Sequence, residues 1–164
     1  MNLSDHPLLK PYAGKSAVLD SNVLLLYWAM FFDPKLIHTF KRLNTFRETD
    51  FILLCETLKI FRSIRTTPHV LTEVSNLANS LPEKRKGAWA AHFSQHIQVI
   101  KEDFVPSAAI ASGPLMHLGL TDAGLASLAS DHVILTVDFP LSKSLESRGL
   151  NVINFTHLRS LWLE

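Results

Sequence analysis

The segment from Ser16 to Leu26 constrains this chain the most, because it places one acid between two apolar runs. Ala17 to Leu19 are apolar, Asp20, Ser21 and Asn22 follow, and apolar residues then resume. This pattern predicts a short buried strand that ends at Asp20, followed by a helix over 22–32. In open α/β sheets, ligands bind at the carboxyl ends of the strands. We therefore expect the Asp20 carboxylate to lie at a ligand-binding edge.

The composition indicates one globular domain of 164 residues, with residues 1–15 as a lead-in segment. Hydrophobic residues make up 47% of the chain and charged residues 19%, and the net charge of +1 neither favours nor excludes a nucleic-acid partner. Cys55 is the single cysteine, so an internal disulfide is excluded. The first residues do not resemble a secretory signal, and the apolar run over 17–32 is too short and too polar to span a membrane. We expect a cytoplasmic protein without a membrane segment.

Strand-like and helix-like segments alternate along the chain. We expect strands over the ranges 17–19, 69–71, 97–100, 133–137 and 151–155. Further helices are expected over the ranges 34–43, 50–65, 83–96, 106–118, 140–148 and 156–162, and also after Thr72 and after Thr121, with Thr49, Thr72, Thr121 and Thr156 as caps. This alternation predicts an α/β fold with a parallel sheet covered on both faces.

Four acids fall at special positions in this layout. Asp20 and Asp138 each follow an apolar strand directly. Glu73 is expected in the first turn of the helix after the second strand, and Asp122 in the first turn of the helix before the fourth. If strands one, two and four are neighbours, the four carboxylates share one crevice, where they repel one another and some pKa values are raised. A hard divalent cation such as Mg²⁺ or Mn²⁺ would relieve that repulsion.

Each of these acids also has an ordinary structural explanation. Acids are common in first helical turns because they interact favourably with the helix dipole. Aspartate after a strand is a frequent turn residue. Taken singly, Glu73 and Asp122 are more simply explained as residues that stabilise a helix start. The coincidence of four acids in one predicted crevice favours the functional interpretation.

Four motifs together resemble the PIN-domain family. They are the segments 18–24, 72–73, 119–123 and 134–138, and the resemblance covers about residues 16–156. Each motif alone is weak, whereas their order and acid placement together are fairly specific. The resemblance implies a three-layer sandwich, a five-stranded parallel sheet flanked by helices. It also implies a Mg²⁺- or Mn²⁺-dependent endoribonuclease acting on single-stranded RNA. Many small family members are toxins paired with an antitoxin protein, and many form homodimers.

The resemblance also assigns roles by position. The catalytic set would be Asp20, Glu73, Asp122 and Asp138, and the metal ligands would be Asp20, Asp122 and Asp138. Asn22 and Thr136 would be polar supports beside them. The chain departs from the family where Phe139 and Pro140 follow the last acid, since many relatives have polar or charged residues there.

Basic residues gather in two places that suit a phosphate backbone. We expect Lys59, Arg62 and Arg65 to line one side of a helix, and Lys84, Arg85 and Lys86 to lie at the start of another. Such residues more often form a solvated helix face, which is therefore the favoured explanation. His92 and His96 have a spacing that can hold zinc, but the glutamate of a zinc-protease motif is absent, so a solvated face is favoured.

Two other functions are compatible with the pattern. A catalytically inactive PIN-like scaffold, or a partner-binding module, would share the fold, but it would not need four acids at one edge. A metal-dependent phosphatase on a related sheet ranks lower, because position 22 is Asn and no Asp-x-Asp pair follows the first strand.

Overall fold

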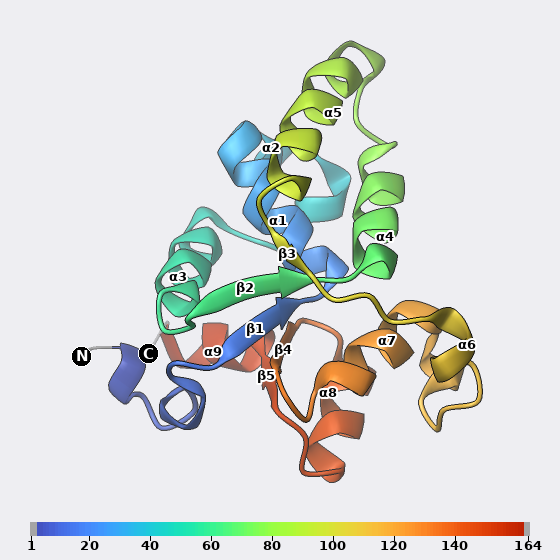
Figure 1. The fold of residues 1–164 in the computed structure, drawn as a ribbon. Coiled ribbons are helices and arrows are strands. Elements are labelled where there is room, and N and C mark those ends of the chain that lie inside the picture. Colours follow the sequence, from blue (N-terminus) through green and yellow to red (C-terminus); the bar gives the residue numbers. More distant parts are fainter. Residues whose placement is uncertain (1–2, 163–164) are drawn as a thin grey trace.

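The computed structural model describes residues 3–162 as an α/β fold around a five-stranded parallel sheet. The strand order is β3-β2-β1-β4-β5, so β1 lies at the centre of the sheet. Helices α1, α4 and α5 lie on one side of the sheet, and α7 and α8 lie on the other (Figure 1). The expected three-layer α/β architecture is confirmed.

The strands are short and follow one another in register. They are β1 (Ser16–Leu19), β2 (Ser63–Thr66), β3 (Lys101–Glu102), β4 (Val133–Thr136) and β5 (Val152–Asn154). Leu19 of β1 pairs with Leu135 of β4, so Asp20 and Thr136 come next to each other at the carboxyl edge. β1 pairs with both β2 and β4, so the condition for a shared crevice, that the first, second and fourth strands are neighbours, is met.

The helices are α1 (Ser21–Phe32), α2 (Leu36–Thr39), α3 (Glu48–Leu58), α4 (Pro68–Ala78), α5 (Glu83–Ile97), α6 (Ser107–Ile110), α7 (Leu120–Leu128), α8 (Phe139–Ser147) and α9 (Phe155–Trp162). Short 3-10 turns occur at η1 (Leu3–Asp5), η2 (Lys10–Tyr12), η3 (Lys41–Leu43) and η4 (Met116–Leu118). Asp20, Thr67 and Asp138 cap α1, α4 and α8 through their side-chain oxygens. Two of the candidate acids are therefore also helix caps.

The second strand was predicted in the wrong place. Residues 69–71 lie in α4, where Val70, Leu71 and Val74 are buried at helical spacing. The strand is β2 instead, in a segment that we expected to continue the helix over 50–65. Thr67 and Pro68 begin α4, as suits a cap followed by proline at the first helical position. Thr72 is therefore not a cap, and Glu73 lies in the second turn of α4, not the first.

Other boundaries differ in smaller ways. The third strand is shorter and later than expected, because residues 97–100 end α5 and form the turn before β3. The expected helices over 34–43 and 106–118 are each two short elements, α2 with η3 and α6 with η4. The helices α3, α7 and α9 each begin one residue before the threonine that was predicted to cap them. Thr49, Thr121 and Thr156 therefore lie inside these helices and are not caps.

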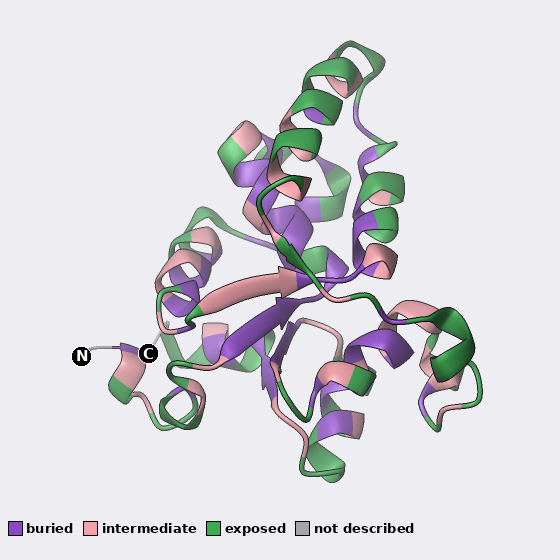
Figure 2. Cartoon of the chain, viewed as in Figure 1, coloured by how far each residue is buried: buried purple, intermediate pink, exposed green. Residues whose placement is uncertain are grey.

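Burial falls from the centre of the sheet to the β3 edge. All residues of β1 and β4 are buried, β2 is mostly half-buried, and β3 is exposed (Figure 2). The carboxyl end of β1 is therefore flanked by closely packed, buried residues. Within residues 3–162, no helix combines the length and the apolar character that crossing a membrane requires.

Candidate active site

Asp20 lies at the junction of β1 and α1 and is only 5% exposed. Its Oδ1 accepts a hydrogen bond from the backbone N of Val23 at 2.7 Å, which caps α1. Its Oδ2 accepts from the hydroxyl of Thr136 and from the backbone N of Val137 at 3.0 Å. Three donors from two elements therefore fix the orientation of this carboxylate.

Thr136 connects Asp20 to Asp138. The Thr136 hydroxyl donates to Asp20 and accepts from the backbone N of Asp138 at 2.9 Å. Asp138 in turn accepts from the backbone N of Leu141 at 2.7 Å, which caps α8. Thr136 thus contacts both acids, at the position predicted for a polar support. Asn22 is exposed in the first turn of α1, and its supporting role stays a prediction.

Glu73 reaches the same edge from α4, although it lies one turn later than expected. Its Oε2 accepts a hydrogen bond from the hydroxyl of Ser21 at 2.7 Å. Ser21 is buried at the start of α1, whereas Glu73 is exposed. The sequence interpretation gave Ser21 no role. Its position directly after Asp20, facing the helix that follows β2, is the signal that would have identified it.

Asp122 lies in the first turn of α7, as predicted. Gly119 precedes this helix with a φ of 108°, a conformation that side chains with a Cβ rarely adopt. Burial, and then the negative charges of Asp138, Asp20 and Glu73, raise the pKa of Asp122 from 3.8 to about 7. Asp122 accepts no hydrogen bond from the rest of the described chain, so nothing there offsets this repulsion.

The pKa of Asp20 is also raised, to about 6, and burial is the largest cause. The hydrogen bonds from Thr136, Val23 and Val137 lower it, and the charge of Asp138 raises it. Burial therefore contributes more to both raised pKa values than the mutual repulsion, which was the cause that we expected. The charges of the other three acids raise the pKa of Asp122 further, as carboxylates at one sheet edge should.

The donor chemistry of this group suits a hard divalent cation, because it consists of carboxylates with uncompensated negative charge. The side chains do not form a ready coordination shell: among residues 3–162, no group of three or more His, Cys, Asp or Glu residues is placed to hold a metal ion. Hydrogen bonds to Val23, Leu141 and Ser21 direct oxygens of Asp20, Asp138 and Glu73 toward protein donors. The charge of the group fits a cation, whose ligation would use the carboxylate lone pairs that these donors leave free.

A cavity of about 370 Å³ lies beside Glu73, between α4 and α7. Thr72, Asn76 and Thr121 contribute polar groups to its lining, and Pro68 and Leu120 contribute apolar ones. Glu73 therefore lines an open hollow that has space for part of a bound molecule.

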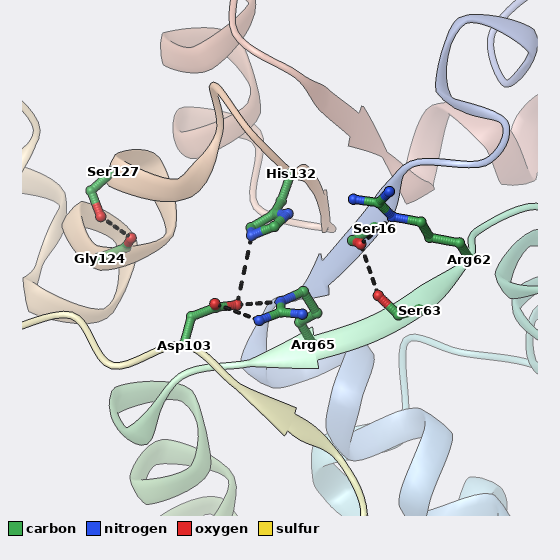
Figure 3. A network of polar contacts seen from close by, with 8 residues as sticks. All are labelled: Ser16, Arg62, Ser63, Arg65, Asp103, Gly124, Ser127 and His132. Atoms are coloured by element: carbon green, nitrogen blue, oxygen red, sulfur yellow. Dashed lines mark hydrogen bonds and ion pairs between the residues drawn. The ribbon is translucent and has the colours of Figure 1, made fainter.

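The first predicted group of basic residues does not form a helix face, because α3 ends at Leu58. Arg65 lies in β2, and its guanidinium donates two hydrogen bonds to Asp103 at 2.6 and 2.7 Å (Figure 3). Arg62 donates to the hydroxyl of Ser16 at 3.2 Å, and Lys59 pairs with Glu56 at 2.5 Å. The prediction of a phosphate-binding stripe is therefore wrong for these three residues as a set.

The second group lies at the start of α5, as predicted, and is partly neutralised. Arg85 pairs with Asp33 at 2.8 Å, and Lys86 pairs with Glu83 at 2.8 Å. Lys84 is exposed and has no ion-pair partner in the described part of the chain. Its contact with RNA stays a prediction.

His92 and His96 lie against α1 and not on a solvated face. His92 Nε2 lies 2.8 Å from the carbonyl oxygen of Trp28, and the two imidazole centroids are 4.1 Å apart. Burial lowers the pKa of His92. The expectation of a fully solvated pair is wrong, because the surrounding rings of Trp28, Phe32, Trp89 and Phe93 enclose one side of them.

No protein-family model matches the chain, and no curated protein matches it in sequence. The residues of the site are therefore the basis for assigning a function.

Proposed function

We propose that this protein is a Mg²⁺- or Mn²⁺-dependent endoribonuclease of the PIN-domain type, which hydrolyses phosphodiester bonds of single-stranded RNA. One observation carries the proposal: four acids come from α4, α7 and the ends of β1 and β4 to one sheet edge. Thr136 connects Asp20 with Asp138, and Ser21, next to Asp20, donates to Glu73. Burial, and then the charges of these three acids, raise the pKa of Asp122 to about 7. A structural cap has no need of three other acids nearby. The open hollow beside Glu73 supports the proposal further, since a substrate needs access to the acids.

Asp20, Asp122 and Asp138 would hold the cation in this proposal. The chemistry that Mg²⁺ or Mn²⁺ would supply when bound there is polarisation of the phosphodiester and a lower pKa of a coordinated water molecule. Asp20 keeps its orientation through the hydrogen bonds from Thr136 and Val137. Ser21 binds Oε2 of Glu73, which leaves Oε1 to orient the attacking water and accept its proton.

The test is cleavage of a mixed pool of single-stranded RNA by the purified protein with Mg²⁺ or Mn²⁺. We expect EDTA to abolish cleavage and Asp20→Asn to remove it. Asp131→Asn is a matched control, because Asp131 is an exposed acid whose side chain makes no hydrogen bond or ion pair within residues 3–162. Cleavage that persists in EDTA or in Asp20→Asn would rule out this mechanism.

A non-catalytic scaffold or partner-binding module is the second candidate. It is favoured by the caps that Asp20 and Asp138 form and by the absence, among residues 3–162, of a residue group placed to hold a metal. The two candidates differ in their response to metal. The nuclease should melt at higher temperature as Mn²⁺ is added, in proportion to the logarithm of its concentration, and the scaffold should not.

The proposal extends to location and partners. We propose a cytoplasmic homodimer that an antitoxin protein can inhibit. An apolar face on α1 and α3 supports the dimer. The ring of Phe31 packs against the ring of Phe51 there, and the side chains of Phe31 and Ile52 are exposed. Light scattering at micromolar concentration should report twice the mass of the chain, and a monomer would contradict the dimer.

A further inference from the structure

Phe139 is a large apolar side chain exposed directly beside the candidate site. It follows Asp138 and is the first residue of α8, and it is 57% exposed. Helix α8 packs against the protein through Leu141 and Leu145, which are completely buried. The ring of Phe139 therefore contributes little to the core, and the fold does not explain an aromatic residue at this position.

Lys143 lies one turn further along α8, and its Nζ is 5.8 Å from the centroid of the Phe139 ring. This spacing of four residues brings side chains to the same side of a helix. Lys143 is exposed and has no acidic partner in the described part of the chain. An aromatic face and an uncompensated cation thus lie together, next to an acid of the site.

We propose that Phe139 stacks against a base of a single-stranded nucleic acid and that Lys143 binds an adjacent phosphate. Every base has a π-face, and aromatic side chains bind single strands by stacking on that face while cations bind the backbone. Bases in a duplex are already stacked and paired, so this pair of residues selects unpaired strands. The inference rests on the proposed function and gives its single-strand selectivity a physical cause.

The surroundings of Phe139 favour a base over a protein partner. Its neighbours on this part of the surface include Asp138 and Lys143, which are charged. The cores of protein interfaces are depleted in charged residues. A single ring flanked by charges matches the size and chemistry of one base and its phosphate.

The test measures binding without relying on cleavage. Fluorescently labelled single-stranded RNA is titrated with the protein in Ca²⁺, and a gel checks that the RNA stays intact. Phe139→Ala should weaken binding about tenfold or more, whereas Phe139→Tyr should bind like wild type, because tyrosine also stacks. Phe104→Ala is the matched control, since Phe104 is 78% exposed and follows β3, which lies three strands from β4 in the sheet, whereas Phe139 follows β4. It should leave affinity unchanged.

Two further measurements identify the contacts. Lys143→Gln should weaken binding and reduce its salt dependence by about one released ion. In Phe139→Trp, single-stranded RNA should quench the added tryptophan fluorescence, and neither an abasic strand nor duplex RNA should do so. Equal affinity of wild type and Phe139→Ala would overturn the inference, as would a lower molecular mass of Phe139→Ala in light scattering, which would assign the ring to a dimer contact.

The outcomes separate this inference from the proposed function. Metal-dependent cleavage by wild type, with unchanged affinity in Phe139→Ala, retains the nuclease and rejects the stacking role. Quenching of Phe139→Trp by single-stranded RNA, without cleavage by wild type, retains the stacking role and rejects the nuclease.

Discussion

The β1–β4 side and the α4–α7 side of the acidic site hold their carboxylates by different means. On the β1–β4 side, Asp20 and Asp138 accept hydrogen bonds from backbone N–H groups and from the Thr136 hydroxyl. On the α4–α7 side, Glu73 has one hydrogen bond, from Ser21, and Asp122 has none within residues 3–162. The pKa values of Asp20 and Asp122 are nevertheless both raised, to about 6 and about 7.

This difference separates structural from electrostatic contributions to one site. Asp20 has a part in the fold, because it caps α1 and connects that helix to β4. Asp122 contributes negative charge that the protein does not compensate with hydrogen bonds. Replacing the two acids should therefore have different consequences for stability, although both should be needed for activity.

The largest predicted difference between the two sides is in the effect of alanine. At about pH 5, below the pKa of Asp20, Asp20→Ala should lower the free energy of unfolding by about 2 to 3 kcal/mol. The substitution leaves three hydrogen-bond donors without their acceptor. At that pH most of the Asp20 carboxyl is protonated, so removing it relieves little of the cost of burying a charge. Asp122→Ala should change it by less than about 0.5 kcal/mol. Urea unfolding measures both values.

Both alanine variants should lose metal-dependent cleavage, so activity does not distinguish the two sides. Asp131→Ala is the control for a change of charge alone. If Asp20→Ala and Asp122→Ala lowered the free energy of unfolding equally, the hydrogen bonds to Asp20 would make no extra contribution to stability, and the proposed difference between the two sides would be wrong.

The second prediction concerns pH and the α4–α7 side. The pKa of Asp122 is raised on folding, so the folded protein binds its proton more tightly than the unfolded chain. The associated stability is complete below the unfolded value of 3.8 and is lost as pH rises through about 7. Asp122→Asn removes this loss. Because this carboxylate is partly exposed and solvent screens its interactions, the advantage of Asp122→Asn over wild type in unfolding free energy should grow in EDTA by about 1 kcal/mol between about pH 5 and about pH 8.

The measurement is a series of urea unfolding curves for wild type and Asp122→Asn at several pH values without metal. Asp131→Asn should follow wild type throughout. A constant difference between Asp122→Asn and wild type would show that Asp122 titrates normally. Added Mn²⁺ should reduce the difference at high pH, because a bound cation stabilises the ionised carboxylates.

The sequence predicted the β1–β4 side well because its signals are local. An apolar run precedes both Asp20 and Asp138. Asp20 follows β1 directly, Asp138 lies two residues after β4, and both strands are fully buried. The β2 strand was missed because Ser63, Arg65 and Thr66 are polar and the strand is mostly half-buried, so its hydrophobic pattern is weak. The apolar pair Val70 and Leu71 was then assigned to a strand, although it is the buried face of α4.

Contacts between elements could not be predicted from local patterns. The hydrogen bond from Ser21 to Glu73 depends on how α1 packs against α4. The pairing of Arg65 with Asp103 depends on the approach of β3 to β2, which turned a predicted RNA contact into an internal ion pair. Glu73 still reaches the site from the second turn of α4, because that helix begins directly at the carboxyl end of β2.

The smallest predicted effect tests the one hydrogen bond on the α4–α7 side. Ser21→Ala removes the donor to Glu73 Oε2, but Glu73 is exposed and water can replace the hydroxyl, so unfolding free energy should change by less than about 1 kcal/mol. If Glu73 orients the attacking water, kcat/KM for RNA cleavage should fall roughly fivefold, which corresponds to about 1 kcal/mol. Ser21→Thr keeps a hydroxyl and should retain most of the activity. An unchanged kcat/KM in Ser21→Ala would mean that the orientation of Glu73 has no part in the reaction, and a loss of several kcal/mol in stability would place Ser21 with the structural, β1–β4 side.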